Sequence, residues 1–205
     1  MPLKKAVFGL QCFWGESALA KIDGVVKTRV GYAGGTAPKP TYQNIQDYTE
    51  VIEATFDDQK ISYQDLLDYF WTHHDPTDHR KKQYRSAILY SDDEQKTLAE
   101  ASFNKVKAAK PSIETYVQKL DHFYVAEDYH QKYWLRCQPR IFNALNLTDE
   151  QVIDSPLAAK MNAFMAGYDN FDVLQQLKKE YNLDDGLVKA VEDIAKRGGD
   201  PRACH

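Results

Sequence analysis

The sequence predicts an α/β (α+β) fold: a two-layer sandwich of ferredoxin-like plan with a helical C-terminal extension. Two patterns support it. Over residues 1–146, strand-like and helix-like stretches alternate in the order β-α-β-β-α-β-α-β with short connections, which is typical of a sheet covered by helices. From residue 147 onward, apolar residues recur at helical spacing only. We therefore expect an α/β domain over 1–146 and a helical extension over 147–205.

Each element of the first unit follows from apolar periodicity and its flanking residues. Buried, β-branched or alternating stretches predict strands at 4–10, 25–32, 50–56, 85–90 and 114–120. Helical spacing predicts helices at 13–22, after a cap at Ser62, at 92–109 after a cap at Ser91, and at 126–135. The proline-containing segment 36–47 predicts a loop.

In the extension, Thr148 begins a capping pattern and about three helices should follow. The last residues, 197–205, are polar and rich in glycine. We expect them to pack against no core and to be mobile.

Charge and cysteine content exclude several classes of protein. A net charge of −4 offers no general attraction to nucleic acid or to an anionic membrane. The apolar stretch near the N-terminus is too short for a signal peptide, and no apolar run approaches the roughly 20 residues of a membrane-spanning helix. The three cysteines are an odd number and too few for a disulfide scaffold. We expect a cytoplasmic monomer without a nucleic-acid or membrane partner.

Cys12 is the first candidate for chemistry. It follows an apolar strand and precedes Phe13, Trp14 and a helix-forming stretch, so it should lie at a strand-to-helix turn. A thiol at the positive end of a helix has a lower pKa than a free cysteine, which favours the nucleophilic thiolate. Free cysteines are also among the most buried residues, and a core position is the alternative for Cys12.

Several short blocks then occur in a fixed order over roughly residues 5–135. They are Gln11-Cys12-Phe13-Trp14-Gly15, Gly31-Tyr32-Ala33-Gly34-Gly35, Pro40-Thr41-Tyr42, Glu50-Val51, His74-Asp75-Pro76-Thr77, Gln83-Tyr84-Arg85-Ser86-Ala87-Ile88 and Ala126-Glu127-Asp128-Tyr129-His130-Gln131-Lys132-Tyr133. This series resembles the A class of the peptide methionine sulfoxide reductases (the MsrA family).

The resemblance implies reduction of methionine S-sulfoxide, free or in proteins, with Cys12 as the nucleophile. The leaving oxygen needs a proton, and a carboxylic acid donates one near neutral pH only when burial raises its pKa. The resemblance implies Glu50 as this acid, with Tyr42 and Tyr84 holding the oxygen. Phe13 and Trp14 would form the pocket for the S-methyl group. A solvated strand-end carboxylate and ordinary packing of the aromatic side chains are the structural alternatives.

The attack would leave a sulfenic acid on Cys12. The resemblance implies that Cys204, in the glycine-containing tail, forms a disulfide with Cys12, which thioredoxin or another dithiol then reduces. No bound cofactor is implied. Cys137, at the end of a predicted helix, is interpreted as structural, although it remains the alternative resolving thiol.

The sequence departs from the family pattern beside the nucleophile and in one pocket segment. Gln11 stands where the family usually has glycine, which is tolerable unless the backbone requires a positive φ. The segment 77–84 is short, and Asp78 is the candidate to replace the family's substrate-binding aspartate, unless that role is vacant.

Other chemistries remain alternatives. His73, His74 and His79 suggest a metal, but adjacent helical residues point about 100° apart and no partners follow at zinc spacing. We therefore expect no metal. A hydrolase using Cys12 and His130 would need an oxyanion hole at the turn. A non-catalytic module that binds methionine-like side chains would keep the pocket without turnover.

Overall fold

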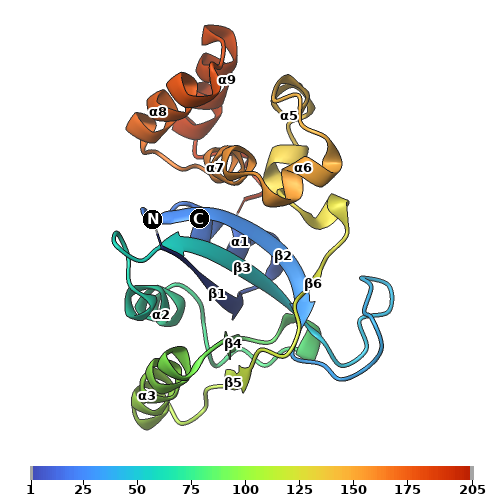
Figure 1. The fold of residues 1–205 in the computed structure, drawn as a ribbon, viewed down its shortest axis with the longest axis vertical. Helices are drawn as coiled ribbons and strands as arrows, with labels where there is room; N and C mark the ends of the chain where they lie inside the picture. Colours follow the sequence, from blue (N-terminus) through green and yellow to red (C-terminus); the bar gives the residue numbers. More distant parts are fainter. Residues whose placement is uncertain (1, 204–205) are drawn as a thin grey trace.

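A six-stranded sheet forms the centre of the molecule. The computed structural model describes residues 2–203, apart from the side chain of Cys12. Within these residues the strand order is β5-β4-β1-β3-β2-β6 (Figure 1), and neighbouring strands pair antiparallel except β4 and β5. The strands are β1 (Leu3–Gly9), β2 (Val25–Ala33), β3 (Thr49–Asp57), β4 (Ala87–Tyr90), β5 (Tyr116–Lys119) and β6 (Tyr124–Val125). The central order β4-β1-β3-β2, with one helix between β1 and β2 and another between β3 and β4, confirms the ferredoxin-like plan.

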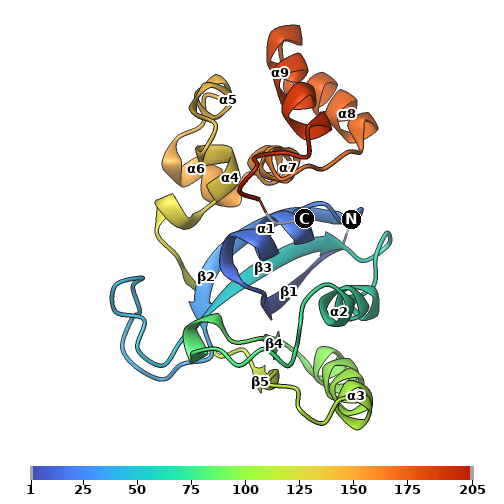
Figure 2. The same cartoon turned by 180° about the vertical axis from the view of Figure 1, so that it is seen from behind.

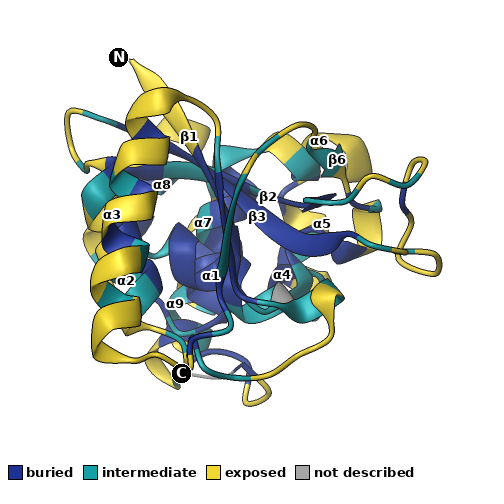
Figure 3. Ribbon diagram, turned by 90° about the horizontal axis from the view of Figure 1, so that it is seen from below, coloured by how far each residue is buried: buried dark blue, intermediate teal, exposed yellow. Residues whose placement is uncertain are grey.

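Three helices pack on one face of this sheet: α1 (Cys12–Ala20), α2 (Tyr63–Thr72) and α3 (Asp93–Ala109). Their apolar residues form one cluster with Phe8 of β1 and Ile52 of β3. The outer surfaces of α2 and α3 are exposed to solvent (Figure 3). This arrangement matches the amphipathic spacing in the sequence.

The starts of α2 and α3 are set by capping side chains. The predicted cap of α2 at Ser62 is confirmed, and Ser62 forms a capping box with Asp65. The predicted cap of α3 at Ser91 is wrong by one residue. The cap is Asp92, whose carboxylate accepts a hydrogen bond from the backbone N–H of Gln95 at 2.8 Å.

The helix predicted over 126–135 does not form. The structure has a 3₁₀ turn, η2 (Asp128–His130), and a short helix, α4 (Tyr133–Arg136), separated by Lys132 at φ 53°. The backbone N–H of Lys132 donates to Glu16 at 2.9 Å and its ammonium group pairs with the same carboxylate. This tertiary contact holds Lys132 in the left-handed region, which a continuous helix excludes.

The extension packs on the sandwich through α7. Helix α5 (Pro139–Ala144) precedes the extension, which contains α6 (Asp149–Asp154), α7 (Pro156–Met165), α8 (Phe171–Tyr181) and α9 (Asp185–Lys196). The capping box at Thr148 begins α6, and four helices lie between residue 147 and Ala203, the last described residue, where the sequence predicted about three. Helix α7 contacts α1 and β2, and α8 and α9 lie beyond it, away from the sheet (Figures 1 and 2). Within residues 2–203, no helix has the length and apolar character to cross a bilayer.

The described part of the tail packs against α7. Gly198 and Gly199 have φ 88° and 84°, and they turn the chain so that the Asp200 N–H donates to the Met165 carbonyl at 2.7 Å. Ala203 is 5% exposed and belongs to the apolar cluster of the extension. The expectation that nothing in the tail packs against a core is therefore wrong for Ala203, because the two glycines let the chain fold back.

Candidate active site

Cys12 is the first residue of α1, directly after the turn that leaves β1. The predicted strand-to-helix placement of this residue is thus confirmed. The side chain of Cys12 and all of Cys204 lie outside the described residues. Gln11, immediately before Cys12, has φ 27° and ψ 72°. The backbone therefore takes the positive φ at which a glutamine, unlike a glycine, is strained.

Glu50 lies on β3 beside this turn. Strand β1 pairs antiparallel with β3 in the register Phe8↔Ile52, so continuing the register places Glu50 next to Leu10, where the chain turns into α1. A Cβ on Gly15 would lie 2.8 Å from Cδ1 of Ile52, so the first turn of α1 packs directly over β3. Because side chains alternate along a strand, Glu50 shares the helix-facing side with Ile52.

Glu50 is 3% exposed, and only one of its two carboxyl oxygens has a hydrogen-bond partner among the described residues. Its Oε1 accepts a hydrogen bond from Gln83 Nε2 at 2.8 Å. Its Oε2 has no hydrogen-bond partner among the described residues. A buried carboxyl oxygen without a partner is costly, so an entering polar group would gain by contacting it.

A second carboxylate, Glu127, connects β2 to the loop that carries Tyr42. The Tyr32 hydroxyl donates to Glu127 Oε2 at 2.6 Å, and the Tyr42 backbone N–H donates to Oε1 at 2.9 Å. Burial alone would raise the pKa of Glu127, but these two hydrogen bonds, together with its own backbone N–H and the charge of His130, lower the pKa overall. Burial raises the pKa of Tyr32, and the charges of Glu127 and Glu50 raise it further, so this phenol stays protonated.

Aromatic rings meet around His130. The Phe13 ring stacks on Tyr133 at a centroid separation of 3.7 Å and faces His130 at 6.1 Å. Tyr42 and Tyr129 lie 4.3 and 4.6 Å from the His130 ring, and both tyrosines are partly exposed. His130 is 4% exposed, and its Nε2 has no partner among the described residues. These rings form an aromatic wall that begins one residue after Cys12.

The remaining predicted residues divide between this wall and its surroundings. Trp14 is half-buried and packs against the cluster that contains Phe8, whereas Phe13 packs against the cluster of the extension. Tyr84 is half-buried at the end of the 3₁₀ turn η1 (Lys82–Tyr84), which also supplies Gln83 to Glu50. Asp78 accepts a hydrogen bond from Arg80 Nε at 2.6 Å, and Arg80 in turn contacts Gln11. The structure therefore brings Asp78 into the segment that borders the turn before Cys12.

Cys137 lies at the C-terminal end of α4 and is half-buried. The charge of Cys137 is the main cause of the raised pKa of Tyr133, and it also raises the pKa of Arg202. Cys137 therefore lies where the described tail meets α4, close to the ring on which Phe13 stacks.

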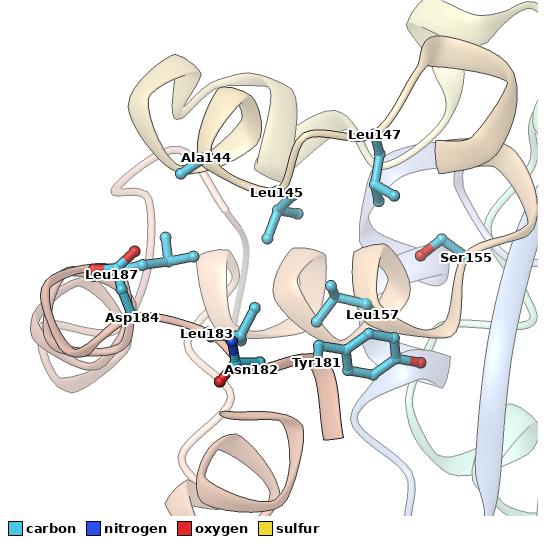
Figure 4. Close-up of a pocket in the computed structure, with 10 residues that line it drawn as sticks. All are labelled: Ala144, Leu145, Leu147, Ser155, Leu157, Tyr181, Asn182, Leu183, Asp184 and Leu187. Carbon is cyan, nitrogen blue, oxygen red and sulfur yellow. The ribbon is translucent and has the colours of Figure 1, made fainter. Parts of the chain in front are cut away.

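Sequence reasoning missed the roles of Tyr32, Gln83 and Glu127. All three lie within the motif blocks, so the signal was present, but nothing in the spacing showed that their side chains converge. A pocket of about 290 Å³ in the extension is separate from these residues, since residues between 144 and 187 line it (Figure 4). Within the described residues, no cluster of three His, Cys, Asp or Glu could hold a metal ion.

Comparison with known proteins gives consistent matches. A family model described as peptide methionine sulfoxide reductase matches residues 4–159. A peptide methionine sulfoxide reductase of Drosophila melanogaster is 42% identical over 180 residues, covering 85% of this chain and 72% of that protein. The MsrA protein of Methanothermobacter thermautotrophicus is 44% identical over 151 residues, covering 67% of this chain and 89% of that protein.

Comparison with solved structures gives matches to the same family. Methionine sulfoxide reductase A of Corynebacterium diphtheriae aligns with a TM-score of 0.58 at 30% identity, over 67% of this chain and 76% of that chain. Mxr1 from Saccharomyces cerevisiae in its reduced form aligns with a TM-score of 0.57 at 28% identity, over 67% of this chain and 87% of that chain. The chain thus belongs to the A class of the peptide methionine sulfoxide reductase family, whose members are oxidoreductases that act on a sulfoxide.

Proposed function

We propose that this protein reduces methionine S-sulfoxide, free or within proteins, to methionine through a sulfenic acid on Cys12. The observation that carries the proposal is the buried, unpartnered Oε2 of Glu50 beside the turn that begins with the nucleophile. Membership of the A class supports the choice of the S-epimer of the sulfoxide.

The first step is attack of the Cys12 thiolate on the sulfoxide sulfur. The sulfoxide oxygen takes a proton and passes to Cys12, so that a thiol and a sulfoxide become a sulfenic acid and a thioether. The methionine sulfur gains two electrons and the cysteine sulfur loses two. The position of Cys12 at the N-terminus of α1 supports this role, because the helix end stabilises a thiolate.

Glu50 supplies the proton to the departing oxygen, and Tyr42 and Tyr84 hold that oxygen. The low exposure of Glu50 and its single partner, Gln83, support this assignment. The Glu127 carboxylate fixes the backbone at Tyr42. A positioned proton donor accelerates such a step by about 10²–10⁴-fold.

Phe13 and Trp14 receive the S-methyl group, with Asp78 near the rest of the substrate. Stacking of Phe13 on Tyr133 supports a rigid wall at this position. A thioether or methyl group gains about 0.3–1.5 kcal/mol from each aromatic contact of this kind.

Cys204 then attacks the sulfenic acid, water leaves, and a Cys12–Cys204 disulfide forms. Thioredoxin or another dithiol reduces the disulfide and takes up its two oxidising equivalents. Family membership and the anchoring of residues 200–203 on α7 support this cycle.

The test is reduction of the separate sulfur epimers of a methionine sulfoxide substrate, with a thioredoxin system and NADPH as the readout. Wild type should reduce the S-epimer, and Cys12→Ser should be inactive. Cys204→Ser should complete one stoichiometric turnover and then stop, while sustained cycling would assign resolution to Cys137 or to an external thiol. Binding without NADPH consumption by the wild-type protein would refute the proposed function.

A further inference from the structure

Gln11 sets the geometry of the nucleophile turn. Its φ of 27° lies in the left-handed region, where a residue with a Cβ is strained. Its carbonyl oxygen accepts the first hydrogen bond of α1, from the Gly15 N–H at 3.5 Å. The turn has no spare room, since a Cβ on Gly15 would lie 2.0 Å from the Leu10 carbonyl oxygen. A change in the conformation of residue 11 would therefore move the start of α1 and with it Cys12.

Arg80 contacts the side chain of this strained residue. With its amide oxygen toward the guanidinium group, Gln11 accepts from Arg80 Nε at 3.2 Å and from Nη2 at 3.3 Å. Nε also donates to Asp78 at 2.6 Å, and this ion pair orients the guanidinium. The single Nε hydrogen is therefore shared between Asp78 and Gln11, and Nη2 of the same planar group donates to the Gln11 oxygen from a fixed direction.

These hydrogen bonds depend on the backbone conformation of residue 11. Relaxation of Gln11 to negative φ would redirect its Cβ, and the side chain would leave Arg80. The contact with Arg80 is then available in the left-handed state only. A partner that binds one of two conformations shifts the population toward that conformation.

We propose that Arg80 is a positioning residue that holds Gln11 in its left-handed conformation, and so holds the turn that presents Cys12. The proposal rests on the proposed role of Cys12 as nucleophile. Arg80 acts through Gln11, without contact with the substrate and without acting as a general positive charge.

The test is a double-mutant cycle of Arg80→Ala and Gln11→Gly in the full chain. Glycine adopts positive φ without strain, so Gln11→Gly removes the need for Arg80. One readout is the rate of iodoacetamide alkylation at Cys12 as a function of pH, mapped to the residue by mass spectrometry. The other is the rate of a single turnover with methionine S-sulfoxide.

We expect Arg80→Ala alone to slow both processes by about fivefold or more, and to have no further effect once residue 11 is glycine. Lys81→Ala is the matched control. It removes the next cation of the same exposed segment and should behave as wild type.

Three results would overturn the proposal. Arg80→Ala could leave both rates unchanged, it could slow them by the same factor with glutamine and with glycine at residue 11, or Lys81→Ala could slow them as much as Arg80→Ala. An equal loss of rate in both backgrounds would mean that Arg80 acts on the substrate or on the thiol directly. Alkylation involves no sulfoxide, so this arm decides the role of Arg80 even if the wild-type protein fails to reduce sulfoxides.

Discussion

Lys132 and Glu16 form a buried ion pair. Lys132 Nζ lies 3.1 Å from Glu16 Oε1, and the two side chains are 0% and 1% exposed. The ammonium group also donates to the backbone carbonyls of Thr28 and Ile153 at 2.5 and 2.9 Å. The pair therefore joins α1, which carries Cys12, to β2 and to α6 of the extension.

Replacing Lys132 alone should destabilise the protein strongly. Lys132→Met leaves the Glu16 carboxylate buried without its counter-charge, which costs about 3–5 kcal/mol in the free energy of unfolding. Urea unfolding of the two proteins measures this difference. The matched variant Glu16→Gln/Lys132→Met removes both charges but keeps an acceptor for the Lys132 backbone N–H, and it should recover part of the loss. A loss below about 1 kcal/mol in the single variant would show that the pair is not strongly coupled.

Replacing the Glu50 carboxyl group should slow the chemistry without unfolding the protein. Glu50→Gln keeps the shape but removes the acid, and single-turnover reduction should fall by about 10²–10⁴-fold. Rapid-quench measurement of methionine formation gives the rate. Glu53→Gln is the control on the same strand, because Glu53 is also buried but is paired with Arg29. Equal rates for Glu50→Gln and wild type would remove Glu50 from the mechanism.

Loss of the Asp200 anchor should slow recycling and spare the first turnover. Asp200 is 3% exposed, and its carboxylate accepts hydrogen bonds from Arg202 within the tail and from Gln138 between α4 and α5, which holds the tail against that segment. Asp200→Ala should lower the effective concentration of Cys204 at Cys12 and reduce thioredoxin-driven turnover by about tenfold. Single-turnover and steady-state rates, measured side by side, separate the two effects. Asp193→Ala, at an exposed carboxylate of α9, is the control, and an equal loss of both rates would contradict the prediction.

The stability of the protein should depend on Lys160 in alkaline solution. Lys160 donates to the Ala20 carbonyl at 2.7 Å, at the C-terminal end of α1. Burial lowers its pKa to about 8 from 10.5, against an opposing contribution from Asp23. Between these values the unfolded chain binds more protons than the folded protein, so the free energy of unfolding rises with pH, by about 3 kcal/mol in all.

Lys160→Met should remove that contribution. Urea unfolding at pH 7.5 and 9.5 should show the wild type gaining stability relative to the variant as the pH rises. The comparison cancels other groups that titrate in this range. A constant difference between the two proteins at both pH values would contradict the prediction.

The sequence was most informative where local chemistry decides the structure. The caps at Ser62 and Thr148 and the apolar face of α2 act over a few residues, so their patterns are visible along the chain. The order of strands and helices followed for the same reason. The position of Cys12 at a strand-to-helix turn was equally readable.

Long-range contacts decided the rest. The pair with Glu16, 116 residues away, breaks the helix expected over 126–135, and the contact of Gln11 with Arg80 accompanies a strained turn that the sequence alone would assign to glycine. Likewise, Glu127 reaches Tyr32 and Tyr42 only because β6 adds to the edge of the sheet beside β2. The sequence by itself determined most of the elements, their order and the candidate nucleophile. The tertiary structure decided which side chains surround the site, because convergence depends on register and packing between distant segments, which no local pattern encodes.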